Sequence, residues 1–305
     1  MLGRSGAPTG SAAGVRSPDP GASPSDATAL VVYPLTALIS DIHSNRQALA
    51  VVLADAAERG VRRYVCLGDV IGYGGRPAEC LERIMEVTGT GTHPDGSPRT
   101  TALDVNGNEV ERGLCLLGNH EQALMQSAED FNPRARAAIE WTREKIGEGG
   151  ERYWNYIGEL RPTECDDRAQ FAHGSPRDPV KEYVLPSDAR NPKKLAAMFG
   201  AQQRDVCFVG HSHVPAVYYA DQRFFAPSGT EGPYRVLSNP GERAIINIGS
   251  VGQPRDRDTR SSYVLFDGDA VTFVRIAYDV AGAQADIREH AALPEYLAER
   301  LGEGR

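Results

Sequence analysis

The sequence contains no long apolar run and little positive charge. Within its 305 residues no stretch approaches the roughly 18 apolar residues that span a bilayer. The N-terminus also lacks the apolar core of about 7–15 residues that marks a secretory signal. Lysine and arginine total 33 against 41 acids, which gives a formal net charge of −8. We therefore expect a cytoplasmic protein with no membrane association and no stable nucleic-acid binding, because nucleic-acid binding usually requires a basic surface.

Cysteine is scarce and shows no framework spacing. The count of five is odd, and Cys66, Cys115 and Cys207 lie inside apolar runs. Buried free thiols in a reducing compartment are therefore expected in place of a disulfide scaffold. No internal repeat or interior linker is visible either. The remaining composition, 41% hydrophobic and 24% charged, is that of a globular chain.

The N-terminal segment lacks the periodic apolar pattern of a folded element. Residues 1 to about 30 are rich in Gly, Ala, Ser and Pro. Such a composition does not bury a core. We predict a disordered tail over residues 1–33 and a single folded domain over residues 34–305.

The first part of the folded domain alternates between strand and helix patterns. An apolar run at residues 35–39 predicts a strand, residues 45–59 a helix that Gly60 ends, and residues 62–67 a second, parallel strand. Residues 88–112 are interpreted as an insertion that forms a hairpin or a mobile loop. The other helices are expected at residues 77–87, 120–127, 133–146, 151–158 and 192–199 and within 281–301.

The second part of the chain is mostly β. Three strands are expected at residues 114–117, 168–172 and 206–209. Between residues 216 and 276, short apolar runs are separated by turn signals, which favours antiparallel pairing. These strands are expected at residues 216–220, 223–226, 234–237, 244–248, 263–266 and 270–276. The economical architecture is two sheets packed face to face with helices outside.

Polar side chains follow several of the expected strands directly. Asp41 and His43 come after the first strand, and residues i and i+2 of an extended chain point the same way. Glycine followed by a polar side chain recurs at Gly68-Asp69. The other polar residues in this context are Asn119, His120, His173, His211 and His213. Ligand sites commonly lie at the carboxyl ends of sheet strands.

Seven of these residues form a candidate metal-ligand set. Seven nitrogen and oxygen donors exceed the needs of one four-coordinate ion, and they suit two ions about 3.5–4 Å apart that share a carboxylate. Two alternatives remain open from the residues alone: Asn119 as a helix cap and His173 as a core histidine. The seven candidates are Asp41, His43, Asp69, Asn119, His173, His211 and His213.

The motifs D-x-H, GD, GNHE, a lone His and GHSH occur in this order, and the chain from residue 35 to 276 resembles the calcineurin-like metallophosphoesterase superfamily. The segment at residues 249–255 is similar to its bacterial branch of small phosphatases and phosphodiesterases. The resemblance implies an α/β fold, a four-layer α/β/β/α sandwich of two mixed sheets. It also implies a dinuclear metal-dependent phosphoric ester hydrolase, in which a metal-bridging hydroxide attacks phosphorus in line.

The resemblance further implies two ligand sets that share one carboxylate. The first set consists of Asp41, His43 and His213. The second set consists of Asn119, His173 and His211. Asp69 is the shared residue. His120 would face the scissile phosphate and protonate the leaving oxygen or donate a hydrogen bond to it. Tyr73 and Arg255 are candidate substrate contacts, with surface roles as the alternative. The cofactors would be two divalent ions, manganese first, with iron or zinc also fitting the donors.

Two departures bear on the substrate. The third motif ends in Glu121, a form typical of the serine/threonine protein phosphatase branch, and Glu121 is expected to support a neighbouring ligand. That branch carries an arginine directly after its second motif, whereas Val70 follows Asp69 here. Protein phosphatase activity and a catalytically silent, metal-bound regulatory or binding protein therefore stand as alternatives. The substrate is expected to be a phosphate-ester small molecule, a nucleotide or a phosphoprotein.

Overall fold

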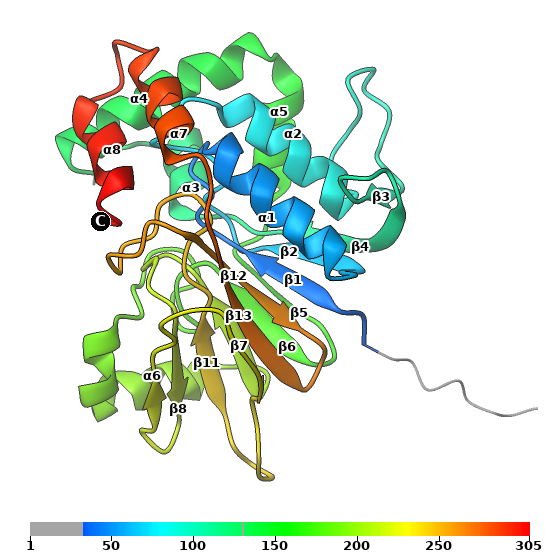
Figure 1. Cartoon of the computed structure of the whole chain (residues 1–305), viewed down its shortest axis with the longest axis vertical. Helices are drawn as coiled ribbons and strands as arrows, with labels where there is room; N and C mark the ends of the chain where they lie inside the picture. The colour runs from blue at the N-terminus through cyan, green and yellow to red at the C-terminus, as the bar shows by residue number, and fades with distance from the viewer. Residues whose placement is uncertain (1–32, 130) are drawn as a thin grey trace, which may run out of the picture. The chain divides into compact units, whose positions relative to one another are not determined.

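Two mixed β-sheets lie face to face in the computed structural model, which describes residues 33–129 and 131–305 (Figure 1). The predicted tail at residues 1–32 lies outside the described residues. The larger sheet has the order β10-β13-β12-β1-β2-β4-β3, and the smaller sheet has the order β5-β6-β7-β11-β8-β9. Each sheet contains parallel and antiparallel pairs: β1 runs parallel to β2 and antiparallel to β12, and β11 runs parallel to β7 and antiparallel to β8.

The strands are short, and helices precede or follow many of them. The larger sheet comprises β1 (Thr36–Ile39), β2 (Arg63–Cys66), β3 (Ala102–Leu103), β4 (Glu109–Cys115), β10 (Glu231–Arg235), β12 (Ser261–Phe266) and β13 (Ala270–Ile276). The smaller sheet comprises β5 (Thr163–Cys165), β6 (Ala169–Ala172), β7 (Val206–Val209), β8 (Ala216–Tyr219), β9 (Phe224–Phe225) and β11 (Ala244–Asn247). The helices are α1 (Arg46–Glu58), α2 (Pro77–Thr88), α3 (Asn119–Met125), α4 (Pro133–Glu148), α5 (Glu151–Glu159), α6 (Pro192–Ala201), α7 (Val280–Arg288) and α8 (Glu295–Glu299), with 3₁₀ turns at Pro186–Arg190 and Arg300–Gly302.

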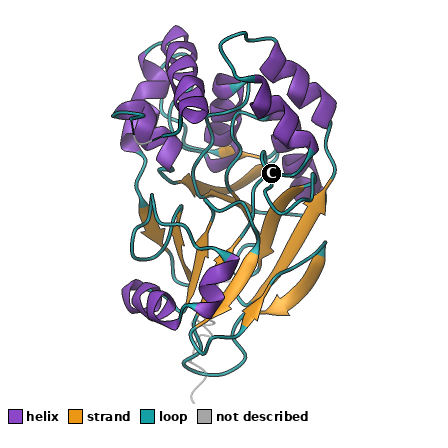
Figure 2. Ribbon diagram, turned by 90° about the vertical axis from the view of Figure 1, so that its left-hand side faces the viewer, coloured by secondary structure: helices purple, strands orange, loops and turns teal. Residues whose placement is uncertain are grey.

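Alternation along each buried strand produces the layers. In β1, Leu38 points into the core between the sheets, while Ala37 and Ile39 point to the helices on the other side. Successive strand residues face opposite sides, so each strand contributes to two cores. Figures 1 and 2 show most helices on one side of the paired sheets and α6 on the other. The predicted four-layer α/β/β/α sandwich is confirmed.

Local sequence signals account for the two helices that cover the larger sheet. The Asn45 side chain caps α1 by accepting a hydrogen bond from the backbone N–H of Ala48 at 3.1 Å. The helix then buries a stripe of residues at helical spacing, namely Ala48, Leu49, Val52, Leu53 and Ala56. Pro77 occupies the first turn of α2, where its missing N–H costs nothing.

Three of the predicted boundaries were wrong. The strand expected at residues 114–117 is β4, which begins at Glu109 and ends at Cys115, and it forms a hairpin with β3 inside the segment interpreted as an insertion. Its first residues belong to the segment that was expected to form a hairpin or a mobile loop, and the structure forms the hairpin. The strand expected at residues 234–237 begins at Glu231, and the expected C-terminal helix is divided into α7 and α8.

The described residues include no helix with the length and apolar character needed to cross a membrane. All five cysteines carry free thiols, and four of them are buried. The expectation of free thiols is confirmed.

The core between the sheets should dominate the stability of the fold. Phe208 is fully buried there, with ring centroids 5.0 Å from Phe266 and 6.1 Å from Phe171. Phe208→Ala should lower the free energy of unfolding by about 3–5 kcal/mol, because it removes buried apolar area and leaves a cavity. Phe224→Ala, at a side chain that is 39% exposed, should cost about 1 kcal/mol or less. Urea denaturation of the two variants would measure both, and equal losses would contradict this account of the core.

Candidate metal centre

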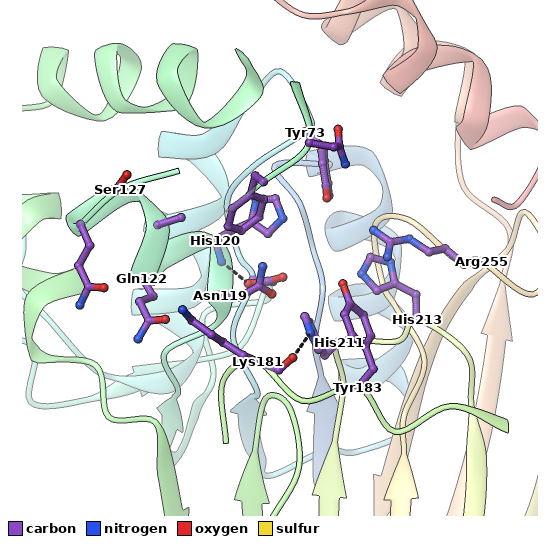
Figure 3. Close-up of a pocket in the computed structure, with 15 residues that line it drawn as sticks. Tyr73, Asn119, His120, Gln122, Ser127, Lys181, Tyr183, His211, His213 and Arg255 are labelled. Atoms are coloured by element: carbon purple, nitrogen blue, oxygen red, sulfur yellow. Dashed lines mark hydrogen bonds between the residues drawn. The ribbon is translucent and has the colours of Figure 1, made fainter. Parts of the chain in front are cut away.

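The polar residues that follow the strands converge at one edge of the two sheets. Asp41 and His43 follow β1, Asp69 follows β2, and Asn119 begins α3 after β4. The smaller sheet contributes the remaining three, which are His173 after β6 and His211 and His213 after β7. All seven predicted ligand residues therefore come together, and each sheet supplies part of the set; Figure 3 labels three of them, Asn119, His211 and His213.

The ligand loops adopt a backbone conformation that side chains rarely take. Five non-glycine ligands have φ between 49° and 65°: Asp41, His43, Asp69, His211 and His213. This left-handed region costs of order 1 kcal/mol or more per residue and persists where the surroundings enforce it. The argument that Asp41 and His43 converge through extended i, i+2 geometry was wrong, because β1 ends at Ile39 and both residues lie in a left-handed turn.

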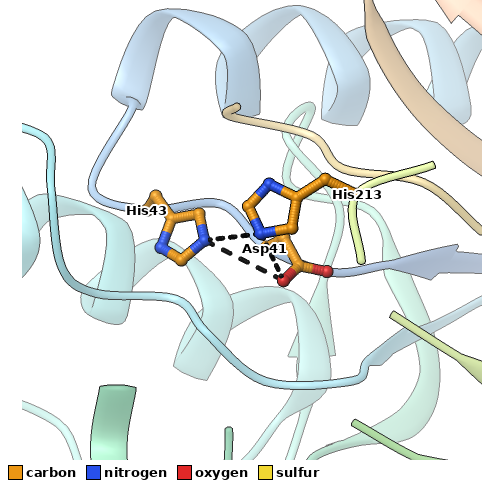
Figure 4. Close-up of side chains that lie close together, drawn as sticks. All are labelled: Asp41, His43 and His213. Atoms are coloured by element: carbon orange, nitrogen blue, oxygen red, sulfur yellow. Dashed lines mark hydrogen bonds and ion pairs between the residues drawn. The ribbon is translucent and has the colours of Figure 1, made fainter. Parts of the chain in front are cut away.

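Asp41, His43 and His213 form the first cluster (Figure 4). The Nε2 atoms of His43 and His213 are 3.2 Å apart. Oδ1 of Asp41 lies 3.1 Å from Nε2 of His213 and 3.9 Å from Nε2 of His43. This Oδ1 atom is buried and has no hydrogen-bond partner among the described residues. The cluster thus presents an unsatisfied carboxylate oxygen to two imidazole nitrogens.

Backbone carbonyls orient the two imidazoles of the first cluster. Nδ1 of His43 lies 3.1 Å from the carbonyl oxygen of Ile71, and Nδ1 of His213 lies 2.6 Å from that of Gln253. A carbonyl oxygen only accepts hydrogen bonds, so each Nδ1 carries a proton. In the neutral rings both Nε2 lone pairs then face the same point, where a cation would relieve their repulsion. The donor set fits a divalent transition ion.

His173 stands at the centre of the second cluster. Its Nε2 atom lies 3.0 Å from Oδ1 of Asn119, 3.1 Å from Nδ1 of His211 and 3.3 Å from Oδ2 of Asp69. Nε2 of His211 donates to the carbonyl oxygen of Lys181 at 3.2 Å, which leaves its Nδ1 lone pair facing the cluster. These donors also fit a divalent ion.

Asp69 lies between the two clusters. Its Oδ2 atom is 3.3 Å from Nε2 of His173 and 3.8 Å from Nε2 of His43. Its other oxygen, Oδ1, accepts a hydrogen bond from the backbone N–H of His120 at 2.9 Å. Asp41 is held in the same way, since its Oδ2 atom accepts from the backbone N–H of His211 at 3.0 Å. One oxygen of each carboxylate is thereby fixed, and the other faces the clusters.

Glu121 anchors the loop that carries Asp69. Its Oε2 atom accepts from the backbone N–H groups of Asp69 at 2.8 Å and Gly118 at 3.0 Å, and its Oε1 atom accepts from those of Val70 at 2.8 Å and Ile71 at 3.1 Å. A Cβ atom on Gly118 would lie 2.2 Å from Oδ1 of Asp69, so only glycine permits this approach. The supporting position expected for Glu121 matches these contacts.

Electrostatics in the buried site favour metal-binding protonation states. Burial lowers the pKa of His211 to about 3 and the pKa of His43 well below its usual value, so both rings are neutral near pH 7. For Asp69, burial is outweighed by His173 and the other imidazoles, which lower its pKa. For His173, burial is outweighed by Asp69, which raises its pKa to about 9. The proton that Asp69 retains on His173 occupies a position where a metal ion would compete with it.

His120 lines a pocket beside the second cluster, and one of its ring nitrogens also lies within 4.8 Å of ligand atoms of His43 and Asp69. The pocket has a volume of about 350 Å³ and also exposes Tyr73, Arg255 and parts of both clusters (Figure 3). The His120 ring packs edge-on against Tyr73 at 4.4 Å and Phe131 at 5.2 Å. A Cβ atom on Gly72 would lie 2.1 Å from Nδ1 of His120. The ring is therefore held in place by the glycine-rich loop.

Two further pocket residues were missed in the sequence. The Tyr183 ring stacks on His211 with centroids 3.7 Å apart, and Lys181 accepts the His211 hydrogen bond through its carbonyl. Both lie in the irregular segment between β6 and α6, where neither a strand end nor a glycine precedes them. No local pattern therefore marked them.

Comparison with known proteins identifies relatives that cover most of the chain. A protein-family model, described as the calcineurin-like phosphoesterase superfamily domain, matches residues 35–270 of this chain. A protein of Methanocaldococcus jannaschii, described as uncharacterised, is 31% identical over 284 residues, which cover 90% of this chain and 100% of that protein.

Two crystal structures extend the comparison. A metallophosphoesterase from Sphaerobacter thermophilus shares 36% identity at a TM-score of 0.69, covering 90% of this chain and 100% of that one. A hypothetical protein from Pyrococcus horikoshii OT3 shares 19% identity at a TM-score of 0.65, and the match covers 89% of this chain and 98% of that one. At this identity the comparison shows a similar fold.

Replacing Glu121 should weaken metal binding at a distance. In Glu121→Gln an NH₂ group would face two backbone N–H donors, so two of the four hydrogen bonds that Glu121 accepts from the backbone would be lost. We expect metal affinity to fall about tenfold to hundredfold and the metal-free protein to lose about 1–3 kcal/mol of unfolding free energy. Chelator competition and urea denaturation measure the two effects. Glu148→Gln, at an exposed glutamate, is the matched control, and a loss of stability with unchanged metal affinity would refute the proposed link.

Proposed function

The chain belongs to the calcineurin-like phosphoesterase superfamily, and we propose on this basis that it is a metal-dependent phosphoric ester hydrolase with two divalent ions. The observation that carries the proposal is the position of Asp69 between two donor clusters that open on one pocket. One ion would bind Asp41, His43 and His213. The other would bind Asn119, His173 and His211, and Asp69 would contact both.

The donor chemistry limits the choice of metal. The clusters contain imidazole nitrogens and carboxamide or carboxylate oxygens, and no thiol is among them. Manganese, iron and zinc accept such ligands, and availability selects among them. We propose manganese as the first ion to test. When bound, such ions supply an acidified water nucleophile for in-line attack on phosphorus and positive charge for the phosphoryl oxygens.

The protein's own residues would bind and orient the ester. The guanidinium of Arg255 faces the pocket and would hold a phosphoryl oxygen by a charge-assisted hydrogen bond. Tyr73 lies beside it and packs against His120. A pocket of about 350 Å³ is within the range of small-molecule sites, which favours a small phosphate ester or nucleotide as the substrate.

His120 is the proposed catalytic residue. Its ring lies against the pocket, close to His43 at a centroid distance of 4.8 Å. From this position it would donate a proton or a hydrogen bond to the leaving oxygen as the P–O bond breaks. Because Gly72 and Phe131 confine the ring, the donor would be oriented before the substrate arrives.

Hydrolysis should depend on metal and on Asp69. After treatment with a chelator the protein should not hydrolyse p-nitrophenyl phosphate or its bis ester, and added manganese should restore at least one activity. Asp69→Asn should lower the metal content from two ions per chain and reduce kcat by about a hundredfold or more, because it removes the shared negative ligand. Asp95→Asn, in an exposed turn, is the control. Metal-loaded protein that binds but never hydrolyses either ester would indicate the silent binding protein instead.

Replacing His120 should affect poor leaving groups most. His120→Ala should lower kcat by about a hundredfold or more for phenyl phosphate and by much less for p-nitrophenyl phosphate, whose leaving oxygen needs little protonation. Metal content, measured in parallel by mass spectrometry, should stay at the wild-type value. An equal loss for both esters would show that His120 does not assist the leaving group.

A further inference from the structure

A second chamber adjoins the metal pocket. It has a volume of about 530 Å³, and the two cavities share the wall residues Tyr73, Asn132, Tyr183 and Arg255. The two cavities are therefore adjacent. The second chamber is lined in addition by Pro133, Arg134, Ala135, Tyr296, Leu297 and Arg300. Its far side therefore comes from the start of α4 and from the C-terminal segment around α8.

Three arginines face this chamber, and two of them are partly buried. Cζ of Arg300 lies 5.8 Å from the ring centroid of Tyr73, and Cζ of Arg255 lies 6.0 Å from the same centroid. Burial and the nearby charge of Arg255 lower the pKa of Arg300 to about 10. Arg134 lies at the edge, 4.2 Å from the ring centroid of Tyr296.

No acidic side chain balances these charges within residues 33–129 and 131–305. The chamber lining includes no aspartate or glutamate, and none of the three arginines forms an ion pair with one. Nη2 of Arg255 donates to the amide oxygen Oε1 of Gln253 at 2.8 Å, and the buried Nε of Arg255 has no hydrogen-bond partner among the described residues. Nε of Arg300 donates to the main-chain oxygen of Arg305. Like charges held together in a partly buried chamber are unfavourable until an anion joins them.

We propose that the second chamber binds a second phosphate group of the same substrate, so that the enzyme acts on bisphosphorylated or polyphosphorylated esters. The inference rests on the proposed function, because it assigns the scissile phosphate to the metal clusters. Arginine suits this role since its planar guanidinium forms paired hydrogen bonds to phosphate oxygens. Arg300 and Arg134 line only the second chamber, so they would recognise the distal phosphate, and Arg255 would lie between the two phosphates.

A series of alkanediol bisphosphates tests the spacing directly. Each bisphosphate of increasing chain length is compared with the monophosphate of the same diol, by phosphate release from manganese-loaded protein. At the length that matches the distance between the chambers, kcat/KM for the bisphosphate should exceed that for the monophosphate by about tenfold or more. The kcat/KM for p-nitrophenyl phosphate in the same sample normalises for the fraction of folded, metal-loaded enzyme.

Arg300→Ala should abolish most of this preference, and Arg300→Lys, which keeps the charge but loses the planar fork, should retain part of it. Arg223→Ala, at an exposed arginine on the turn between β8 and β9, should keep the wild-type preference and rate. Calorimetric binding of the same compounds to metal-loaded His120→Ala gives the comparison without turnover. No preference at any chain length, or a preference that survives in Arg300→Ala, would overturn the inference. Failure to hydrolyse both p-nitrophenyl phosphate and its bis ester would count against the proposed function instead.

Discussion

The structure of the site depends on buried polar ligands that hold one another in place. Asp41 accepts the backbone N–H of His211, and Asp69 accepts that of His120, so each carboxylate fixes a neighbouring ligand loop. The loops of β1 and β2 are joined further by the hydrogen bond from the N–H of Asp41 to the carbonyl oxygen of Gly68 at 3.1 Å. Left-handed backbone and buried charge are both unfavourable alone. They persist here because the two packed sheets leave the loops little freedom to relax.

The candidate ligand residues could be predicted from the sequence because their signal is local. A buried strand that ends in glycine and a polar side chain is visible in a few residues, and its recurrence at Asp69, Asn119 and His211 pointed to one edge of a sheet. The β/α alternation and the apolar runs likewise indicated the layers, since strands buried on both faces are almost continuously apolar. What the pattern could not supply was the conformation at the strand ends. Asp41 and His43 come together through left-handed turns, and no pattern in the amino-acid sequence indicates that backbone conformation.

Features made by distant segments remained hidden. One of the two neighbours of β1 is β12, which lies more than two hundred positions further along the chain, and two apolar runs do not reveal such a pairing or its register. The same holds for the second chamber, whose walls join α4, the segment after β6 and the C-terminal turn. Arg300 and Tyr296 belong to an ordinary polar helix pattern. Their proposed role depends on their position near Arg255 and Tyr73 in the chamber, and that position results from the packing of α7 and α8 against α1 and α4.

The glycine-rich loop after β2 connects the reaction to the choice of substrate. Gly72 lies against the imidazole of His120, and the next residue, Tyr73, has φ of 61° and forms part of the wall shared by the two chambers. A shift of this loop would therefore move the proposed proton donor and the entrance to the arginine chamber together. Glu121 restrains the start of the same loop through the backbone N–H groups of Val70 and Ile71. Glu121 thus contacts the one short segment that carries Asp69 and leads to Gly72 and Tyr73, so under the proposed function a change in this glutamate would affect metal binding and substrate preference together.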